Sequence, residues 1–200
     1  GYGACEILIR KAAMELTRLK VNSQYRPCVD EAPYFSWVIT SDKKNVMQTS
    51  YHITVTGLGE VVWDSGVVES DKSTFVEYNG KPLKSLSDYS WTVEVTVNNG
   101  EKAAASSSFE TGFMKKEWTA EWVKSPFPMK KVKPGTGGQN PAEYFRKEFG
   151  VRDGIKRARV YATCHGAYQL SMNGMRPDDR EFAPEFTVYS QYLCYQTYDV

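Results

Sequence analysis

From Gln48 to Phe113 the chain is a run of strand-like segments separated by turn residues, and this pattern constrains its fold more than any other feature. In the segments Tyr51–Thr56 and Trp91–Val97, every second residue is aromatic or aliphatic and the residues between are polar. Successive side chains of a strand point to opposite faces of a sheet. Each segment therefore predicts a strand with one buried and one solvated face.

Further strand and turn signals surround these two segments. Leu16–Val21 and Tyr34–Ile39 read as two more strands, and Asn98-Asn99-Gly100 predicts a hairpin with a primed turn, because Asn and Gly tolerate positive φ. The turn signals divide the stretch from Leu16 to Phe109 into about seven short strands, the number in an immunoglobulin-like or fibronectin type III-like sandwich. We assign this sandwich to residues 16–113 and a lead-in segment or cloning remnant to residues 1–15.

A second strand-rich block occupies residues 114–200 and resembles only part of a sandwich. The pattern predicts roughly five strands, with a turn at Asn173-Gly174. The longer strand segments are Tyr144–Phe149, Arg157–Thr163, Ala167–Met172 and Tyr192–Tyr198. A Pro-, Gly- and Lys-rich stretch near 125–141 predicts a flexible loop. Unpaired sheet edges are an aggregation liability, so we expect the remaining strands beyond Val200.

Composition excludes several classes of function. The net charge is +1, which argues against a nucleic-acid partner because such a partner requires a basic surface. No apolar run is long enough to cross a membrane. The four cysteines form no CxxC pair, so zinc and thioredoxin-type sites are not predicted, while a disulfide stays open. Arg10 and Lys11 interrupt the apolar N-terminus in a way that does not suit a signal peptide.

The residues suggest no catalytic centre in this chain. Asp178 and Asp179 are an adjacent acidic pair in a predicted loop, where neighbouring side chains point apart, whereas glycoside hydrolysis usually needs two carboxyl groups flanking one bond. With Glu181 they form a candidate contact for a sugar hydroxyl or for calcium, although EF-hand spacing is absent. His52, His165 and the neighbouring cysteine show no triad motif. We therefore predict no catalytic residue and no required cofactor.

A resemblance to a known family rests on many short motifs in a fixed order. The chain resembles the N-terminal accessory region of bacterial α-L-rhamnosidases, glycoside hydrolase family 78, from about Leu16 onward. The matching pieces are Pro33-x-Phe35-Ser36-Trp37, Gln48-Thr49-x-Tyr51, Val62-Trp63-Asp64-Ser65-Gly66, Tyr89-Ser90-Trp91, Phe109-Glu110-Thr111-Gly112, Trp118-x-Ala120-x-Trp122-Val123, Phe145-Arg146-Lys147-Glu148-Phe149, Ala158-Arg159-Val160-Tyr161, Tyr168-x-Leu170-x-Met172-Asn173-Gly174, Ala183-Pro184-x-Phe186-Thr187 and Tyr195-x-Thr197-Tyr198-Asp199-Val200. Each piece is structural, and the order and spacing carry the resemblance.

The resemblance implies an all-β chain: a fibronectin type III-like sandwich followed by part of a jelly-roll, galactose-binding-like sandwich. In the family these domains precede an (α/α)6 barrel that holds the catalytic carboxylates, and no position of this chain corresponds to them. The implied parent enzyme is an inverting hydrolase of terminal α-L-rhamnose in glycans, and its expected location is secreted or periplasmic. The chain itself is expected to pack on the barrel and support it.

Two other functions remain open from the residues alone, because a fold does not by itself specify a function. A stand-alone carbohydrate-binding module would bind a monosaccharide without any barrel. A structural or adhesive module would bind no sugar and would present a large apolar patch to its partner.

Overall fold

The computed structural model describes residues 14–127 and 142–200. The chain divides into two compact units, Gly1–Ala120 and Glu121–Val200, and each is described by itself. The described residues form strands and no helix, which agrees with the all-β prediction. The predicted lead-in at 1–15 lies almost entirely outside the described residues, as does most of the predicted loop near 125–141.

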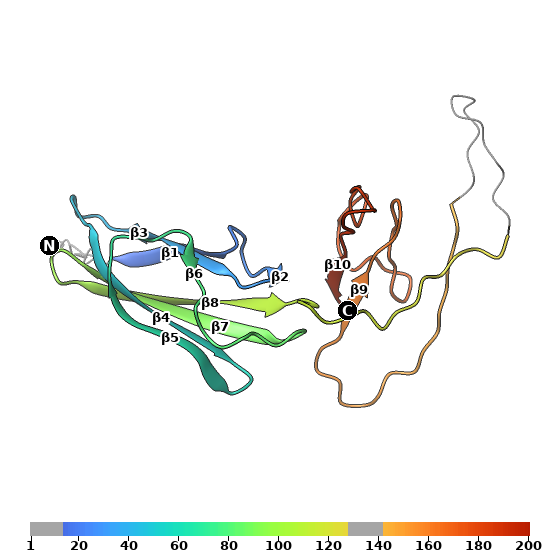
Figure 1. Cartoon of the computed structure of the whole chain (residues 1–200), viewed down its shortest axis with the longest axis horizontal. Helices are drawn as coiled ribbons and strands as arrows, with labels where there is room; N and C mark the ends of the chain where they lie inside the picture. The colour runs from blue at the N-terminus through green and yellow to red at the C-terminus, as the bar shows by residue number, and fades with distance from the viewer. Residues whose placement is uncertain (1–13, 128–141) are drawn as a thin grey trace, which may run out of the picture. The chain divides into compact units, whose positions relative to one another are not determined.

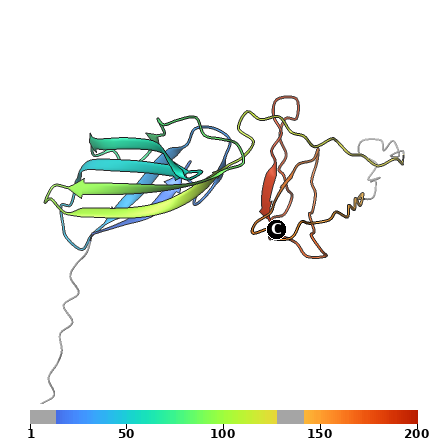
Figure 2. The same ribbon diagram turned by 90° about the horizontal axis from the view of Figure 1, so that it is seen from below.

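The first unit is a sandwich of two sheets. One sheet has three strands in the order β1-β3-β6, and the other has five in the order β2-β8-β7-β4-β5. The strands are β1 (Glu15–Val21), β2 (Cys28–Val29), β3 (Tyr34–Thr40), β4 (Gln48–Gly57), β5 (Glu60–Glu69), β6 (Val76–Glu77), β7 (Asp88–Val97) and β8 (Lys102–Thr111). Figures 1 and 2 show β1 and β3, in blue, lying over the layer of green strands. Neighbouring strands are antiparallel except for the pair β2 and β8.

The alternating residues of β4 and β7 build the core of this sandwich, as predicted. Tyr51, Ile53 and Val55 of β4 are buried, and so are the five apolar residues of β7. Antiparallel register places Val55 opposite Trp91 and Ile53 opposite Val93. Trp37 and Trp91 are the largest buried side chains, 1% and 0% exposed. Three polar residues among those described, Gln48, Ser50 and Thr111, are also buried.

The hairpin at Asn98-Asn99-Gly100 forms where predicted, but its turn is of another type. Of the three residues only Gly100 has a positive φ, at 83°, whereas a primed two-residue turn needs a positive φ at its first central residue (type II′) or at both (type I′). Gly100 N donates to Val97 O at 2.8 Å, which fits a three-residue loop closed by a left-handed glycine. A two-residue loop with positive φ at both positions occurs instead at Leu58 and Gly59, between β4 and β5.

The second unit contains less regular structure than the alternation predicts. Its named strands are β9 (Arg159–Ala162) and β10 (Gln196–Asp199), which pair antiparallel. The predicted strand Tyr144–Phe149 is irregular and exposed, and the predicted hairpin from Ala167 is reduced to isolated bridges. The expectation of roughly five strands is therefore wrong for the described residues. An alternating pattern supplies a face, but a strand also needs a neighbour to complete its hydrogen bonds.

The turn at Asn173-Gly174 is present, with φ of 50° and 83° at the two residues and a bridge between Met172 and Met175. Among the described cysteines, Cys164 and Cys194 are free thiols. Within the described ranges no helix is long and apolar enough to span a membrane.

Candidate functional site

The acidic residues singled out from the sequence lie in the second unit, beside two arginines. Arg176 Nη1 lies 2.7 Å from Glu181 Oε1, and Arg180 Nε lies 2.7 Å from Asp178 Oδ2. The second contact is an ion pair by distance only, because Asp178 Oδ2 is buried without a hydrogen bond of acceptable geometry. Asp178 Oδ1 accepts a 3.1 Å bond from the backbone N–H of Arg180. Asp179 is exposed.

Arg180 anchors this loop to the C-terminal strand β10. Its guanidinium donates to Gln196 Oε1 and, at 3.2 Å, to the backbone oxygen of Thr197, and it lies 5.2 Å from the centre of the Tyr198 ring. The Tyr198 hydroxyl bonds Tyr168 at 2.9 Å. Burial, followed by this hydrogen bond, raises the pKa of Tyr168 well above its usual range. These contacts fix the loop to the unit, which is a structural role.

The three acidic residues do not form a metal cage. In the described part of the chain no three His, Cys, Asp or Glu side chains are grouped so that they could hold a metal ion. Calcium requires six to eight oxygen ligands, and here the oxygens of Asp178 and Glu181 face guanidinium groups. Asp179 is exposed and, among the described residues, forms no hydrogen bond or close ion pair with an arginine, although its charge contributes to raising the pKa of Arg176.

Each of the two histidines contacts a neighbouring side chain of its own unit. His52 Nε2 lies 2.6 Å from Asp64 Oδ1 on the solvated face of β4 and β5. The His165 ring stacks on Tyr189 with centroids 4.7 Å apart. Burial raises the pKa of the neighbouring Cys164, which lowers the thiolate population that a nucleophile needs. Among the described residues, neither histidine is therefore part of a catalytic triad.

The sequence analysis missed a hollow of about 410 Å³ in the first unit. It is lined by Tyr51, Trp63, Asp64, Ser65, Val68, Lys72, Val76, Glu77 and Asn79. The residues come from β4, from β5 and from the segment that leads through β6. Strands β5 and β6 are terminal strands of different sheets, so the hollow lies where the sandwich is open along one side.

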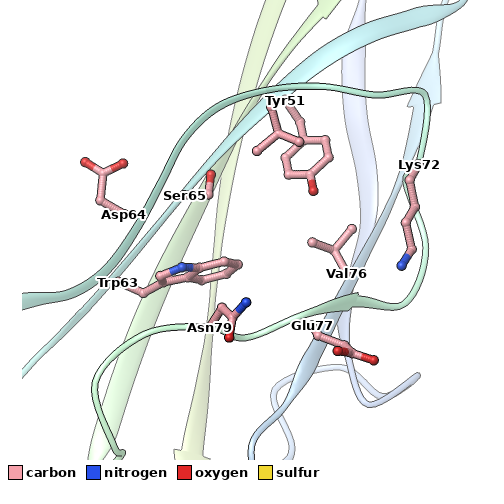
Figure 3. A pocket seen from close by; sticks show the side chains of 9 residues that line it. Tyr51, Trp63, Asp64, Ser65, Lys72, Val76, Glu77 and Asn79 are labelled. Carbon is pink, nitrogen blue, oxygen red and sulfur yellow. The ribbon is translucent and has the colours of Figure 1, made fainter.

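Figure 3 shows how the side chains surround this space. The Tyr51 hydroxyl points toward the gap between Trp63 and Val76, and the Lys72 amine lies beyond Val76. The Asp64 carboxylate points away from the space, because it accepts bonds from His52 at 2.6 Å and from the backbone N–H of Gly66 at 2.8 Å. Burial raises the pKa of Tyr51, so its hydroxyl stays protonated near neutral pH.

The walls of the hollow are fixed by the core. The Trp63 ring stacks on Phe35 at 5.8 Å and meets Tyr78 edge-on at 5.3 Å. The side-chain amide of Gln48 donates to the backbone oxygens of Ser70 and Lys72, each at 2.9 Å. These bonds hold the segment that carries Lys72 against β4. No repeat or motif signals this arrangement, because its members are spread over three segments.

Comparison with known proteins identifies the family. Residues 16–115 match the family described as Rha78A-like, N-terminal immunoglobulin domain, which covers half of the chain, and residues 153–200 match the α-L-rhamnosidase N-terminal domain. The chain belongs to the α-L-rhamnosidase family and corresponds to its N-terminal region. The predicted resemblance to glycoside hydrolase family 78 and the immunoglobulin-like sandwich are therefore confirmed.

Curated α-L-rhamnosidases resemble this N-terminal region over most of its length. One from Formosa agariphila is 29% identical over 95% of the chain, and one from Streptomyces avermitilis is 30% identical over 82%. The chain spans 23% and 18% of these relatives, respectively. The chain thus corresponds to about a fifth of the length of these rhamnosidases.

Solved rhamnosidase structures share the fold. The structure of the α-L-rhamnosidase from Dictyoglumus thermophilum superposes with a TM-score of 0.81 at 32% identity, covering 92% of this chain and 23% of that one. The enzyme from Aspergillus terreus gives a TM-score of 0.73 at 22% identity, covering 94% and 22%, and supports the fold alone.

Proposed function

We propose that this chain is the non-catalytic N-terminal part of an enzyme that hydrolyses terminal α-L-rhamnose from glycans. The observation that carries the proposal is the match of nearly the whole chain to about a fifth of several α-L-rhamnosidases. The catalytic carboxylates belong to an (α/α)6 barrel of the same polypeptide, and the hydrolysis proceeds with inversion. The enzyme is secreted or periplasmic, where plant and microbial glycans are accessible.

The chemistry of the acidic residues supports a non-catalytic role for the chain. An inverting glycosidase places two carboxyl groups about 6.5–9.5 Å apart across a sugar, one of them with a raised pKa. Asp178 and Glu181 instead make close ion pairs with Arg180 and Arg176. Both carboxylates therefore face guanidinium groups of their own loop and do not face each other across an open sugar site.

Exposed apolar side chains support a packing role for the second unit. Trp122, Phe182, Phe186 and Tyr192 are each more than half exposed. Groups of exposed apolar residues commonly mark a surface that meets another domain. The proposed occupant is the catalytic barrel, and the role of the unit is to support it and shape its substrate cleft.

An activity comparison tests the proposal. The chain of 200 residues, the complete reading frame that contains it, and that reading frame without residues 1–200 are incubated with p-nitrophenyl α-L-rhamnoside. We expect hydrolysis by the complete protein with release of β-L-rhamnose as the first anomer, and none by the chain alone. Hydrolysis by the chain alone, or a complete protein inactive on α-L-rhamnosides, contradicts the proposal.

Calcium and sugar contacts at Asp178, Asp179 and Glu181 need a separate test. We propose that the chain needs no metal and that Asp179 is the group of the three best placed for a sugar hydroxyl. Calcium added to the chain should leave the backbone amide NMR signals of residues 176–181 unchanged. Saturable shifts there, removed by Asp179→Asn, would show a cation site instead.

A further inference from the structure

The hollow beside Trp63 combines an apolar wall with hydrogen-bonding groups. Tyr51, Trp63, Val68 and Val76 supply aromatic and aliphatic surface, and Lys72, Glu77 and Asn79 supply polar ends. Sites for small molecules have this composition and a volume of about 300–1,000 Å³, and the 410 Å³ of this hollow falls within that range.

The polar side-chain groups that line the hollow are available to a ligand. Within the described residues, no hydrogen bond or ion pair engages the side-chain polar groups of Tyr51, Lys72, Glu77 or Asn79. Other charged side chains of the same unit do find partners, such as Lys81, which lies 3.2 Å from Glu60. The polar groups of the hollow are therefore hydrated in the free protein and can exchange water for ligand hydroxyls.

The balance of charge selects the class of ligand. Lys72 carries one positive charge and Glu77 one negative charge, while the Asp64 carboxylate is turned away toward His52. A phosphate or carboxylate ligand would meet Glu77, and a metal ion would meet Lys72. Donors and acceptors are both present, because Asn79 and Tyr51 offer each kind. A neutral polyol with an apolar face satisfies all of these groups.

The site is rigid before any ligand arrives. Tyr34 and Phe35 lie opposite Glu77 and Val76 across the β3–β6 pair, and the backbone N–H of Trp37 donates to Ser73 O at 2.9 Å. With the two Gln48 bonds to Ser70 and Lys72, these contacts hold the segment from residue 70 to residue 77 in place. A preorganised site loses less entropy on binding.

We infer that this hollow is a binding site for a neutral saccharide ring, which packs its C–H face against Trp63 and Val76. Its hydroxyls bond Tyr51, Lys72, Glu77 and Asn79. The site lies on the immunoglobulin-like unit, separate from the acidic residues of the second unit, and its existence does not depend on catalysis by the parent protein. Only the choice of L-rhamnose as the first probe rests on the proposed function.

The test is a titration of the isotopically labelled 200-residue chain with L-rhamnose, D-galactose and D-glucose, followed by amide and indole NMR signals. A single exposed sugar ring gains little binding energy, so concentrations up to about 50 mM are needed. We expect saturable shifts of the Trp63 indole N–H and of the amides of Lys72, Val76 and Asn79. We expect Lys72→Ala and Asn79→Ala each to weaken binding about fivefold or more, the effect of losing roughly one hydrogen bond.

Matched controls separate this site from general effects. Lys44→Ala removes an exposed lysine outside the hollow, and Glu94→Gln changes an exposed carboxylate on β7, so both should leave the affinity unchanged. Trp63→Phe keeps an aromatic ring at this position and is used in place of Trp63→Ala, which risks unfolding the unit. Inorganic phosphate and calcium should not compete with the sugar.

Each outcome decides the inference. Shifts confined to the hollow for any of the three sugars support the site, whichever of them binds most tightly. The inference is overturned if no sugar shifts these signals, if the shifts map to residues 176–181, or if Lys72→Ala and Asn79→Ala bind sugar as well as the unaltered chain.

Discussion

The indole N–H of Trp37 donates a 2.9 Å hydrogen bond to the side-chain oxygen of the buried Gln48. The amide nitrogen of the same Gln48 donates to the backbone oxygens of Ser70 and Lys72. One polar side chain thus joins the centre of the sandwich to the segment that forms the rim of the hollow. Because a buried polar group without a partner is costly, this junction fixes both regions together.

Two matched tryptophan substitutions measure the Trp37 hydrogen bond. Trp37 and Trp91 are both fully buried, but Trp91 Nε1 has no hydrogen-bond partner among the residues that the structure describes. Trp37→Phe and Trp91→Phe remove similar volumes, and only the first leaves Gln48 Oε1 unpaired. We expect Trp37→Phe to lower the free energy of unfolding by about 1–3 kcal/mol more than Trp91→Phe, measured by urea denaturation. Equal losses would show that the bond contributes no net stability.

Replacing Gln48 should destabilise the first unit strongly. Gln48→Ala leaves the Trp37 N–H and two backbone oxygens without this partner. We expect the free energy of unfolding to fall by about 2–4 kcal/mol. The exposed Lys44→Ala should change it by about 0.5 kcal/mol or less. A Gln48→Ala variant as stable as the unaltered chain would mean that water replaces all three bonds.

Gly80 is expected to tolerate no side chain. A Cβ at this position would lie 2.5 Å from both Trp63 Cβ and Val62 O, and 2.6 Å from the Tyr78 hydroxyl. We expect Gly80→Ala to cost about 1–3 kcal/mol of stability through displacement of these groups. Gly150→Ala is the control, because nothing lies within 4 Å of its Cβ position. Thermal or urea unfolding of the two variants compares them directly, and equal stability would contradict the close approach.

Asp64 should titrate below its usual range. Its pKa is lowered from 3.8, first by the backbone N–H of Gly66 and next by the side chain of His52. A depressed folded pKa means that the contribution to stability is present above the unfolded pKa and is lost as the pH falls through the folded value. Because the carboxylate is fully exposed, the effect on unfolding should be small and sensitive to salt.

Carboxyl NMR titration checks this pH dependence. His52→Ala should raise the pKa of Asp64 only part of the way toward 3.8, since the Gly66 bond remains. A pKa that returns fully to the usual value would assign the whole effect to His52, and an unchanged pKa would assign it to Gly66.

The sequence of the first unit predicted its strands and core because each signal is local. A period of two over Tyr51–Thr56 and Trp91–Val97 specifies which side chains share a face, and the buried residues agree. Turn type was less predictable. Asn98 and Asn99 tolerate positive φ, yet the chain places that conformation at Gly100 and at Leu58-Gly59 instead.

For the second unit the same kind of pattern was insufficient. Tyr144–Phe149 was predicted as a strand but has no pairing partner among the described residues. Asp178 and Glu181 were recognised as acidic residues of a loop, but their ion pairs with Arg180 and Arg176 were not predicted, because they depend on how the loop folds.

By itself the sequence determined an all-β chain of the rhamnosidase type, because side-chain alternation, turn residues and ordered motifs are written along the chain. Only the tertiary structure decided that Tyr51, Trp63, Lys72 and Asn79 surround one hollow. The reason is that β5 and β6 belong to different sheets. Their meeting depends on how the sheets stack and on the Gln48 bonds, and neither leaves a periodic signal in the sequence.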